Sequence, residues 1–320
     1  MSTLVFVEHH DRAPQESALG VLGKAASLEG DVAAVVCGEH AREVAAELGR
    51  YGAQRVFAAD APALAAPLPQ PRVDVITALI GEHGFDTVLL GSSVLAADIA
   101  AALAARLEAG LNYGLVDLRL DGDRLVGVQP ILGDSAYANV GWTATPRLAL
   151  FRSGVLEPRD VGGSADVINV SPSVHEWSQA ARLLEQDRGE SEGPSIEEAD
   201  IIVAGGRGLG APEHFSIVED LAQALGGAVG ATRAVVDAGW YPYSTQVGQT
   251  GKTVTPKLYV ACGISGAIQH KVGMQNASVI VAINKDRNAP IFDYCDLGVV
   301  GDLHQIMPKL TELIRQRTSG

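Results

Sequence analysis

The sequence predicts an α/β protein of two domains, and three observations support this. Short apolar runs alternate with helical patterns, which is typical of βαβ units built around a parallel sheet. One polar, acidic segment separates two such stretches, and a length of 320 residues suits about two domains. A content of 47% apolar residues and a mean hydropathy of +0.15 allow each domain its own buried core.

The N-terminal half holds the first alternating stretch. Strands are predicted where short apolar runs end in polar or glycine-containing turns, at 4–7, 32–36, 55–58 and 87–90. After the last of them, apolar residues recur every four positions from Leu95 to Leu107 and form one face of a helix. We therefore expect a Rossmann-like domain in which helices connect the strands of a parallel sheet.

The pattern changes in the middle of this half. Residues 115–120 alternate, Asp121-Gly122-Asp123 is typical of a tight turn, and 125–128 follow as a second short strand. This arrangement predicts a β-hairpin. Further strands are expected at 148–151 and 167–170. The N-terminal α/β domain is therefore predicted to span residues 1–184.

A linker is predicted at 185–195, because this stretch is polar and acidic and contains Gly and Pro. A new α/β pattern begins behind it, so the second domain is predicted at 196–320. Its apolar strands and helical patterns indicate a doubly wound parallel sheet. We expect strands at 200–204, 258–262 and 278–283 and helices at 212–225 and 303–315.

Composition excludes several classes of protein. A formal net charge of −14 argues against binding to nucleic acid, which requires a basic face. The three cysteines are far apart and form no CxxC pair, so neither a zinc site nor an iron–sulfur cluster is expected. No metal site is expected at 8–11 either, because adjacent histidines on an extended chain point in opposite directions. Without a signal peptide or an apolar run of membrane-spanning length, a soluble cytoplasmic protein is predicted.

The first motif is glycine-rich. Residues 206–211 fit G-x-G-x-x-A between a predicted strand and a predicted helix, which favours a dinucleotide phosphate. The acid expected about 20 residues later is absent from 226–231, so the usual NAD contact is weakly supported. Arg207 lies inside the loop, where it could pair with a phosphate. A plain strand–helix turn with a surface arginine remains an equal alternative.

The second motif, at 246–253, resembles a phosphate-binding P-loop. Its end, Gly251-Lys252-Thr253, matches, but Gln246 stands where the first glycine belongs and no apolar strand precedes it. ATP hydrolysis is therefore rejected. Because the segment is rich in Gln, Thr and backbone N–H donors, it is predicted to be a loop that holds a polar ligand.

Two further segments follow predicted strands. Residues 263–266 place free N–H groups and the Ser265 hydroxyl at a turn suited to a phosphate. A glycine follows Ser265 directly, which departs from the nucleophile elbow of hydrolases, so a hydrolase is not expected. Asn284 lies where the next strand ends, a common place for ligands in open α/β sheets.

Taken in order, these segments resemble the alpha subunit of electron transfer flavoproteins. The resemblance is strong over about 200–310 and looser in the first domain, and the sequences GQTGK and SGAIQH are highly specific for it. The matching segments are Gly205–Leu209, Ala231–Trp240, Val247–Lys252, Gly263–His270, Val281–Asp286 and Gly298–Leu303.

The resemblance implies a redox carrier rather than a stand-alone enzyme. It implies one FAD in the C-terminal domain and a heterodimer with a beta subunit that binds AMP. Such a heterodimer shuttles electrons from flavin dehydrogenases, such as those acting on acyl-CoA in fatty acid β-oxidation, to a membrane quinone reductase, without itself inserting into a membrane. A subunit of an electron-bifurcating flavoprotein complex is the alternative, and a nucleotide-binding stress-type protein is a third reading.

The resemblance also implies a set of cofactor-binding residues. Those near the FAD diphosphate are Arg207, Ser265, Gly266 and Ala267. Those that line the cofactor are Thr232, Val247, Gly248, Gln249, Thr250 and Gln269, with Gly251 and Ile268 beside them. Those at the adenosine end are Asn284, Asp302 and Leu303. The flavin-tuning residues around the isoalloxazine ring are Arg233, Thr250 and His270.

The implied tuning has a simple physical basis. A protein shifts the potential of a flavin through charges and hydrogen bonds around the ring. A positive Arg233 would stabilise the negative charge that the ring gains on reduction, and His270 would donate to its pyrimidine edge. The Thr250 hydroxyl would contact N5. The family often has Ser at the position of Thr232, and both side chains carry a hydroxyl.

Overall fold

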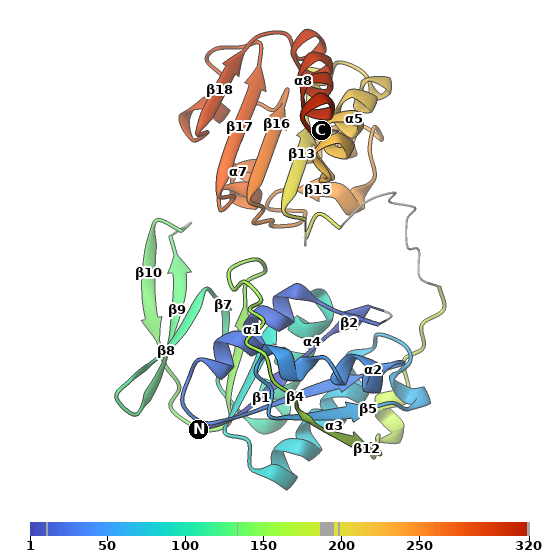
Figure 1. Ribbon diagram of the computed structural model, residues 1–320, viewed down its shortest axis with the longest axis vertical. Helices are drawn as coiled ribbons and strands as arrows, with labels where there is room; N and C mark the ends of the chain where they lie inside the picture. The colour runs from blue at the N-terminus through green and yellow to red at the C-terminus, as the bar shows by residue number, and fades with distance from the viewer. Residues whose placement is uncertain (11, 133, 186–194, 198, 319–320) are drawn as a thin grey trace. The chain divides into compact units, whose positions relative to one another are not determined.

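The computed structural model (Figure 1) describes residues 1–10, 12–132, 134–185, 195–197 and 199–318. The chain divides into two compact units, Met1–Gln186 and Asp187–Gly320. Most of the predicted linker, residues 186–194, lies outside the described residues. The two units are therefore described separately.

The N-terminal unit is built on a seven-stranded sheet in which every pairing is parallel. Its order is β12-β5-β4-β1-β6-β11-β7. The strands are β1 (Ser2–Phe6), β4 (Asp31–Cys37), β5 (Arg55–Ala59), β6 (Thr87–Gly91), β7 (Leu111–Leu115), β11 (Arg147–Phe151) and β12 (Asp166–Val170). All six strands predicted for this sheet are present. The sequence pattern does not predict β7 as a separate strand, because it places Leu115 in the hairpin.

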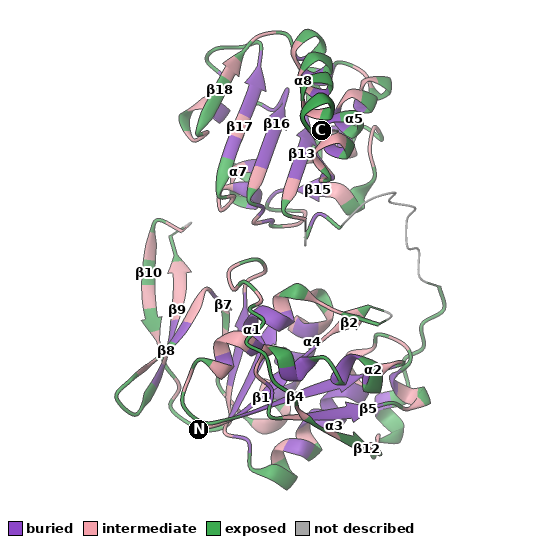
Figure 2. Ribbon diagram, viewed as in Figure 1, coloured by how far each residue is buried: buried purple, intermediate pink, exposed green. Residues whose placement is uncertain are grey.

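Helices cover both faces of this sheet. Val5 points to the face that packs against α1 and α2, whereas Leu4 and Phe6 point to the face that packs against α3 and α4. Figure 2 shows the strands β1, β4 and β5 between them as largely buried. The helices are α1 (Glu16–Ala26), α2 (Ala41–Ala45), α3 (Pro69–His83) and α4 (Val94–Leu107), with short 3-10 turns η1 (Leu48–Tyr51), η2 (Pro62–Leu64) and η3 (Glu176–Gln179).

A second, antiparallel sheet follows β7. The predicted hairpin is confirmed: β8 (Asp117–Asp121) pairs with β9 (Arg124–Ile131), and Asp121 lies opposite Arg124. A third strand, β10 (Ala136–Val140), was not predicted, because its polar and small residues lack an apolar run. Near the N-terminus, β2 (His9–His10) and β3 (Ala13–Pro14) form a short ribbon.

The C-terminal unit contains a six-stranded parallel sheet of order β15-β14-β13-β16-β17-β18. In chain order this is third, second, first, fourth, fifth and sixth, the Rossmann arrangement, so the predicted doubly wound sheet is confirmed. The strands are β13 (Ile201–Gly205), β14 (Ala228–Thr232), β15 (Gln246–Val247), β16 (Leu258–Cys262), β17 (Val279–Asn284) and β18 (Leu297–Val300). The sequence pattern does not predict β14 and β18, because each contains a glycine. It does not predict β15 either, because this strand is very short.

A hydrophobic core lies on each face of this second sheet. Helices α5 (Ser216–Leu225) and α8 (Leu303–Thr318) pack on one face, and α7 (Ile268–Met274) packs on the other. The predicted helix 212–225 is wrong at its start, because 212–215 form a 3-10 turn and α5 begins only at Ser216. The remaining elements are α6 (Arg233–Val236), η4 (Arg207–Leu209), η5 (Pro212–Phe215), η6 (Tyr243–Thr245) and η7 (Pro290–Asp293).

Candidate functional site

The candidate site follows the carboxyl ends of the C-terminal sheet. Because all six strands are parallel, the segments behind them meet at one edge, and the order reverses between β13 and β16. Ligands of open α/β sheets bind outside this edge, at such a reversal. Every predicted cofactor-binding residue lies at the end of a strand of this sheet or in the segment that follows it. The fold therefore gathers residues between Arg207 and Leu303 along one edge.

Two loops cross closely at the reversal point. The amide of Gly206 donates to the Cys262 carbonyl at 2.9 Å, and that of Gly208 donates to the Gly263 carbonyl at 2.9 Å. A Cβ atom on Gly208 would lie 2.6 Å from the Cα of Gly263, which real side chains do not tolerate. Glycine is therefore required for the backbone contact itself. The contact holds the loop after β13 against the loop after β16. Arg207, in the first of these loops, is exposed.

The glycine motif does not lead straight into a long helix. The loop behind β13 passes through two 3-10 turns before α5 begins at Ser216. The predicted placement of a phosphate at the N-terminus of a helix that opens directly behind 206–211 is therefore not the local geometry. What the structure provides there is a tight loop with the exposed guanidinium of Arg207.

The segment 248–252 is bound tightly to α7. The amide of Gln249 donates to the Gln269 carbonyl at 2.7 Å, and the amide of Val254 donates to the Gly273 carbonyl at 2.8 Å. A Cβ on Gly273 would lie 2.3 Å from the nitrogen of Gly248. The GQTGK and SGAIQH motifs, separate in sequence, therefore form one packed structure.

His270 lies beneath this contact and is 7% exposed. Its Nδ1 lies 3.0 Å from the Val247 carbonyl, and its Nε2 lies 3.0 Å from the Tyr259 hydroxyl. Burial lowers the pKa of His270 from 6.5 to about 4, against the opposing effect of the hydrogen bond to Val247. Both ring nitrogens thus have partners within the protein, which differs from the expected donation to a flavin ring.

This burial predicts a pH-dependent stability. In the unfolded chain, His270 becomes protonated as the pH falls through 6.5, whereas in the folded protein it becomes protonated only near pH 4. His270 therefore contributes stability that is fully present above pH 6.5 and is lost as the pH falls toward 4. We expect this residue to lower the free energy of unfolding by about 3 kcal/mol over that range.

Urea unfolding of the C-terminal unit at several pH values checks this expectation. His270→Gln removes the titrating group, so the profile of the variant should be flatter than that of the wild type below pH 6.5. Subtracting one profile from the other cancels the carboxylates, which titrate in both proteins. Parallel profiles would show that His270 is not held neutral by the fold.

The residues expected at the adenosine end hold the edge together. Asn284 is buried at the end of β17; its amide donates to the Ile264 carbonyl at 2.9 Å, and its oxygen accepts from the Asp286 amide at 3.0 Å. Asp302 is exposed, and its carboxylate accepts from the His304 amide at 3.0 Å. Leu303 is buried in the core beside α5 and α8, so only its backbone is available to a ligand.

The remaining predicted residues differ in exposure. Val247, Gly248 and Gly266 are buried, and Thr232 and Gly251 are partly buried. Ile268 is 74% exposed, which leaves a large apolar side chain uncovered at the sheet edge. The exposed predicted side chains are those of Arg207, Arg233, Gln249, Thr250, Ser265, Ala267, Ile268, Gln269 and Asp302. An open surface of polar, apolar and cationic groups results.

Arg233 begins α6 directly behind β14. Its Nε donates to the carboxylate of Asp237 at 3.1 Å, one helical turn later, and both side chains are exposed. On the neighbouring loop, the Thr250 hydroxyl accepts from the Gln246 amide at 3.2 Å, and the Tyr243 hydroxyl donates to the Thr250 carbonyl at 3.0 Å. The Arg233 guanidinium is thus balanced by one carboxylate and remains accessible to an anionic ligand.

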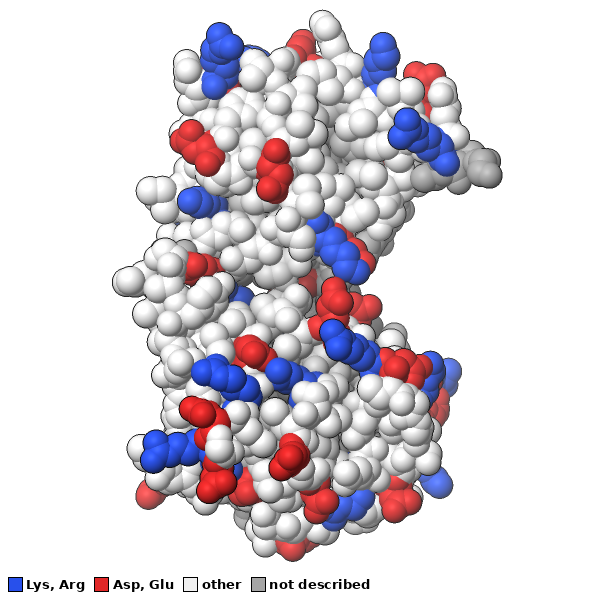
Figure 3. All heavy atoms as spheres, turned by 60° about the vertical axis from the view of Figure 1, so that its left-hand side comes forward, with Lys and Arg blue, Asp and Glu red and all other residues white. Residues whose placement is uncertain are grey.

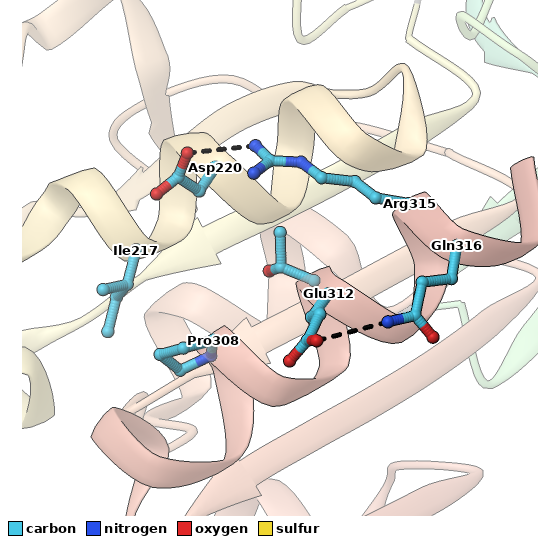
Figure 4. A pocket seen from close by; sticks show the side chains of 7 residues that line it. Ile217, Asp220, Pro308, Glu312, Arg315 and Gln316 are labelled. Carbon is cyan, nitrogen blue, oxygen red and sulfur yellow. Dashed lines mark hydrogen bonds and ion pairs between the residues drawn. The ribbon is translucent and has the colours of Figure 1, made fainter. Parts of the chain in front are cut away.

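A hollow elsewhere on this unit contains none of these residues. It has a volume of about 510 Å³ and lies between α5 and α8, where Arg315 donates to Asp220 at 3.1 Å. Figure 4 shows its mixed lining of charged, polar and aliphatic side chains. The candidate site is therefore an open sheet edge, separate from this hollow.

The described residues offer no metal site and no helix that could span a membrane. They contain no group of three or more His, Cys, Asp or Glu side chains that could hold a metal ion. Within the same residues, no helix combines the length and apolar character needed to cross a membrane. On the face shown in Figure 3, acidic and basic side chains are interspersed, and none of the basic ones gather into a broad patch.

The edge fits a dinucleotide such as FAD. Gly206, Gly208 and Gly263 allow the two loops at the reversal point to pack closely against each other. Arg207 is exposed beside them, and hydroxyl and amide side chains line the neighbouring loops. Backbone amides and arginine are the groups that commonly hold a diphosphate. The sequence motifs do not identify Tyr259 as part of this site. It is a lone aromatic residue inside an aliphatic strand, and its hydroxyl reaches His270.

Comparisons with known proteins point to one family over nearly the whole chain. Residues 195–275 match the "Electron transfer flavoprotein FAD-binding domain", and residues 3–175 match the "Electron transfer flavoprotein domain". Three similar proteins are each named "Electron transfer flavoprotein subunit alpha". That of Mycobacterium tuberculosis is 42% identical, over 98% of this chain and 98% of its own. That of Bacillus subtilis is 39% identical over 92% and 90%, and that of Thermoanaerobacterium thermosaccharolyticum is 38% identical over 98% and 97%.

Proposed function

The chain belongs to the electron transfer flavoprotein alpha-subunit family, and on this premise we propose that it is the FAD-holding subunit of a heterodimeric electron shuttle. The shuttle takes electrons from flavin dehydrogenases, such as acyl-CoA dehydrogenases, and passes them to a membrane quinone reductase. One FAD is held by this chain and AMP by the beta subunit. The observation that carries the proposal is the gathering of all the family motifs at one sheet edge.

The proposed binding mode follows the edge from strand to strand. Arg207 and the segment Ser265–Ala267 hold the diphosphate, on either side of the glycine crossing. Asn284 and Asp302 hold the adenosine end, because they follow β17 and β18. Arg233 and Thr250 lie beside the isoalloxazine ring, behind β14 and β15. The exposed side chain of Ile268 supplies an apolar contact for the cofactor.

FAD, when bound, supplies the electron-accepting ring, and the chain sets how readily that ring accepts charge. Arg233 places a positive charge at the edge that stabilises negative charge on a neighbouring group. Its partner Asp237 offsets part of this charge, 3.1 Å away. Since both side chains are more than half exposed, water screens the interaction, and the effect on the potential is modest.

Removal of the Arg233 charge should lower the midpoint potential of the bound flavin. We expect Arg233→Ala to lower it by on the order of 40 mV, which corresponds to about 1 kcal/mol for one electron. Asp237→Asn should raise it, because the offsetting carboxylate is gone. Arg315→Ala, which removes an arginine from an exposed ion pair on α8, is the matched control. Equal potentials in all four proteins would remove Arg233 from the proposed site.

Coexpression with the beta subunit tests the function as a whole. The purified complex should be yellow, contain one FAD and one AMP, and accept electrons from an acyl-CoA dehydrogenase in a reconstituted assay. A second FAD in place of AMP would instead favour an electron-bifurcating complex. A colourless complex without flavin would refute the proposal.

A further inference from the structure

A buried chain of hydrogen bonds joins three elements beneath the candidate site. It runs from the Tyr259 hydroxyl in β16, through the His270 ring in α7, to the Val247 carbonyl at the end of β15. Both donor–acceptor distances are 3.0 Å. Tyr259 is 0% exposed and Val247 is 1% exposed, so solvent does not compete for these bonds.

The chemistry of the groups gives the chain a direction. A carbonyl oxygen only accepts hydrogen bonds, so the Nδ1 of His270 carries the proton that bonds to Val247. A neutral imidazole then has a lone pair on Nε2, which accepts from the Tyr259 hydroxyl. Burial supports both states, since it lowers the pKa of His270 to about 4 and raises the pKa of Tyr259 well above its usual value.

The last bond of the chain holds a particular peptide group. The peptide between Val247 and Gly248 accepts from His270 through its carbonyl and donates to the Lys252 carbonyl, at 3.1 Å, through its amide. Gly248 has φ +145° and would meet the Gln269 carbonyl at 2.9 Å if it carried a Cβ. The orientation of this peptide therefore sets the position in space from which the segment 249–251 continues.

We propose that Tyr259 and His270 are positioning residues for the loop 248–252. The Tyr259 hydroxyl holds the His270 ring in its Nδ1–H form, and the ring in turn holds the Val247 carbonyl. His270 thus acts on the cofactor through the loop, in contrast to the direct donation to the ring that the resemblance implies. The consequence for the cofactor rests on the proposed FAD site, whereas the hydrogen-bonded chain itself is testable without it.

Tyr259→Phe removes one hydroxyl and keeps the packing of the ring. In hydrogen–deuterium exchange of the full chain, peptides covering 247–254 should exchange about tenfold faster than in the wild type, as expected for the loss of one buried hydrogen bond. Tyr241→Phe is the matched control, because its hydroxyl bonds to Glu219 at 3.0 Å, outside the loop. Unchanged exchange over 247–254 in Tyr259→Phe would overturn the proposal.

Two replacements of His270 separate the indirect role from the direct one. Asparagine places an amide donor near the position of Nδ1, and glutamine places one near that of Nε2. If the ring acts by holding Val247, His270→Asn keeps most of the slow exchange over 247–254, and His270→Gln loses it about tenfold. If the glutamine variant is the better substitute, the bond to Val247 is not the important one and the proposal fails.

Nitrogen NMR of the protein labelled at histidine reads the tautomer directly. The His270 signals, assigned as those missing from His270→Asn, should show a protonated Nδ1 and an unprotonated Nε2 at pH 7. A protonated Nε2 would contradict the proposed direction of the chain. The exchange and NMR measurements are made with and without FAD. If the chain gives the expected exchange rates and tautomer but binds no FAD, the positioning role stands and the proposed function fails.

Discussion

Replacement of Gly208 by alanine is expected to weaken FAD binding strongly. The new Cβ would lie 2.6 Å from the Cα of Gly263 and 2.7 Å from its carbonyl oxygen, and both are backbone atoms that have no rotamer to escape through. The two loops at the reversal point must then separate, which breaks the bond from the Gly208 amide to the Gly263 carbonyl. Such overpacking costs about 1–3 kcal/mol in well-packed cores.

We therefore expect FAD affinity to fall by about a hundredfold, with the C-terminal unit destabilised by about 2–3 kcal/mol. Flavin titration and urea unfolding measure the two effects. Gly81→Ala is the control, since Gly81 lies within α3 and a Cβ there meets no atom within 4 Å. It should stabilise its helix slightly, by up to about 1 kcal/mol. Wild-type FAD affinity in Gly208→Ala would show that the crossing plays no part in the site.

The second large effect is expected from Arg72→Ala in the N-terminal unit. Arg72 is 5% exposed, and its guanidinium donates to the carbonyls of Leu64, Ala66, Leu68 and Cys37 at 2.7–3.4 Å. Alanine would leave these carbonyls without this donor and would open a cavity beside β4. We expect the N-terminal unit to lose about 3–5 kcal/mol of stability.

Arg72→Lys tests the fork geometry separately from the charge. Lysine has three donors on one nitrogen and cannot span four carbonyls in the same way, so only part of the stability should return. Arg124→Ala, at an exposed position next to the hairpin turn, is the control and should change stability by less than about 0.5 kcal/mol. Thermal or urea unfolding measures all three variants, and an Arg72→Ala protein as stable as the control would refute the role of the carbonyl cluster.

Much of the C-terminal fold follows from local pattern. Apolar runs at 200–204, 258–262 and 278–283 are strands because they are β-rich and end in glycine or polar turns. β14 and β18 escaped prediction because glycine weakens their pattern, although pairing with β13 and β17 makes them strands. The start of α5 was predicted too early, because Pro212 suits both a first helical position and a 3-10 turn.

For the candidate site, the structure shows where the motifs lie relative to the strands. The motifs were located correctly as segments that follow strands, and parallel pairing explains why they meet at one edge. The orientation of individual side chains was not predictable, since it depends on packing between segments far apart in the chain. The buried position of His270 and its contact with Tyr259 are the clearest examples, because periodicity says nothing about which atoms lie within 3.0 Å.

The sequence by itself determined the α/β class, the family and the segments that carry the motifs, because these depend on local periodicity and on specific residue order. Only the tertiary structure decided the Rossmann strand order, the close crossing of Gly208 and Gly263, and the neutral, buried state of His270. The physical reason is that strand pairing, close backbone contact and desolvation all arise between segments that the linear sequence keeps apart.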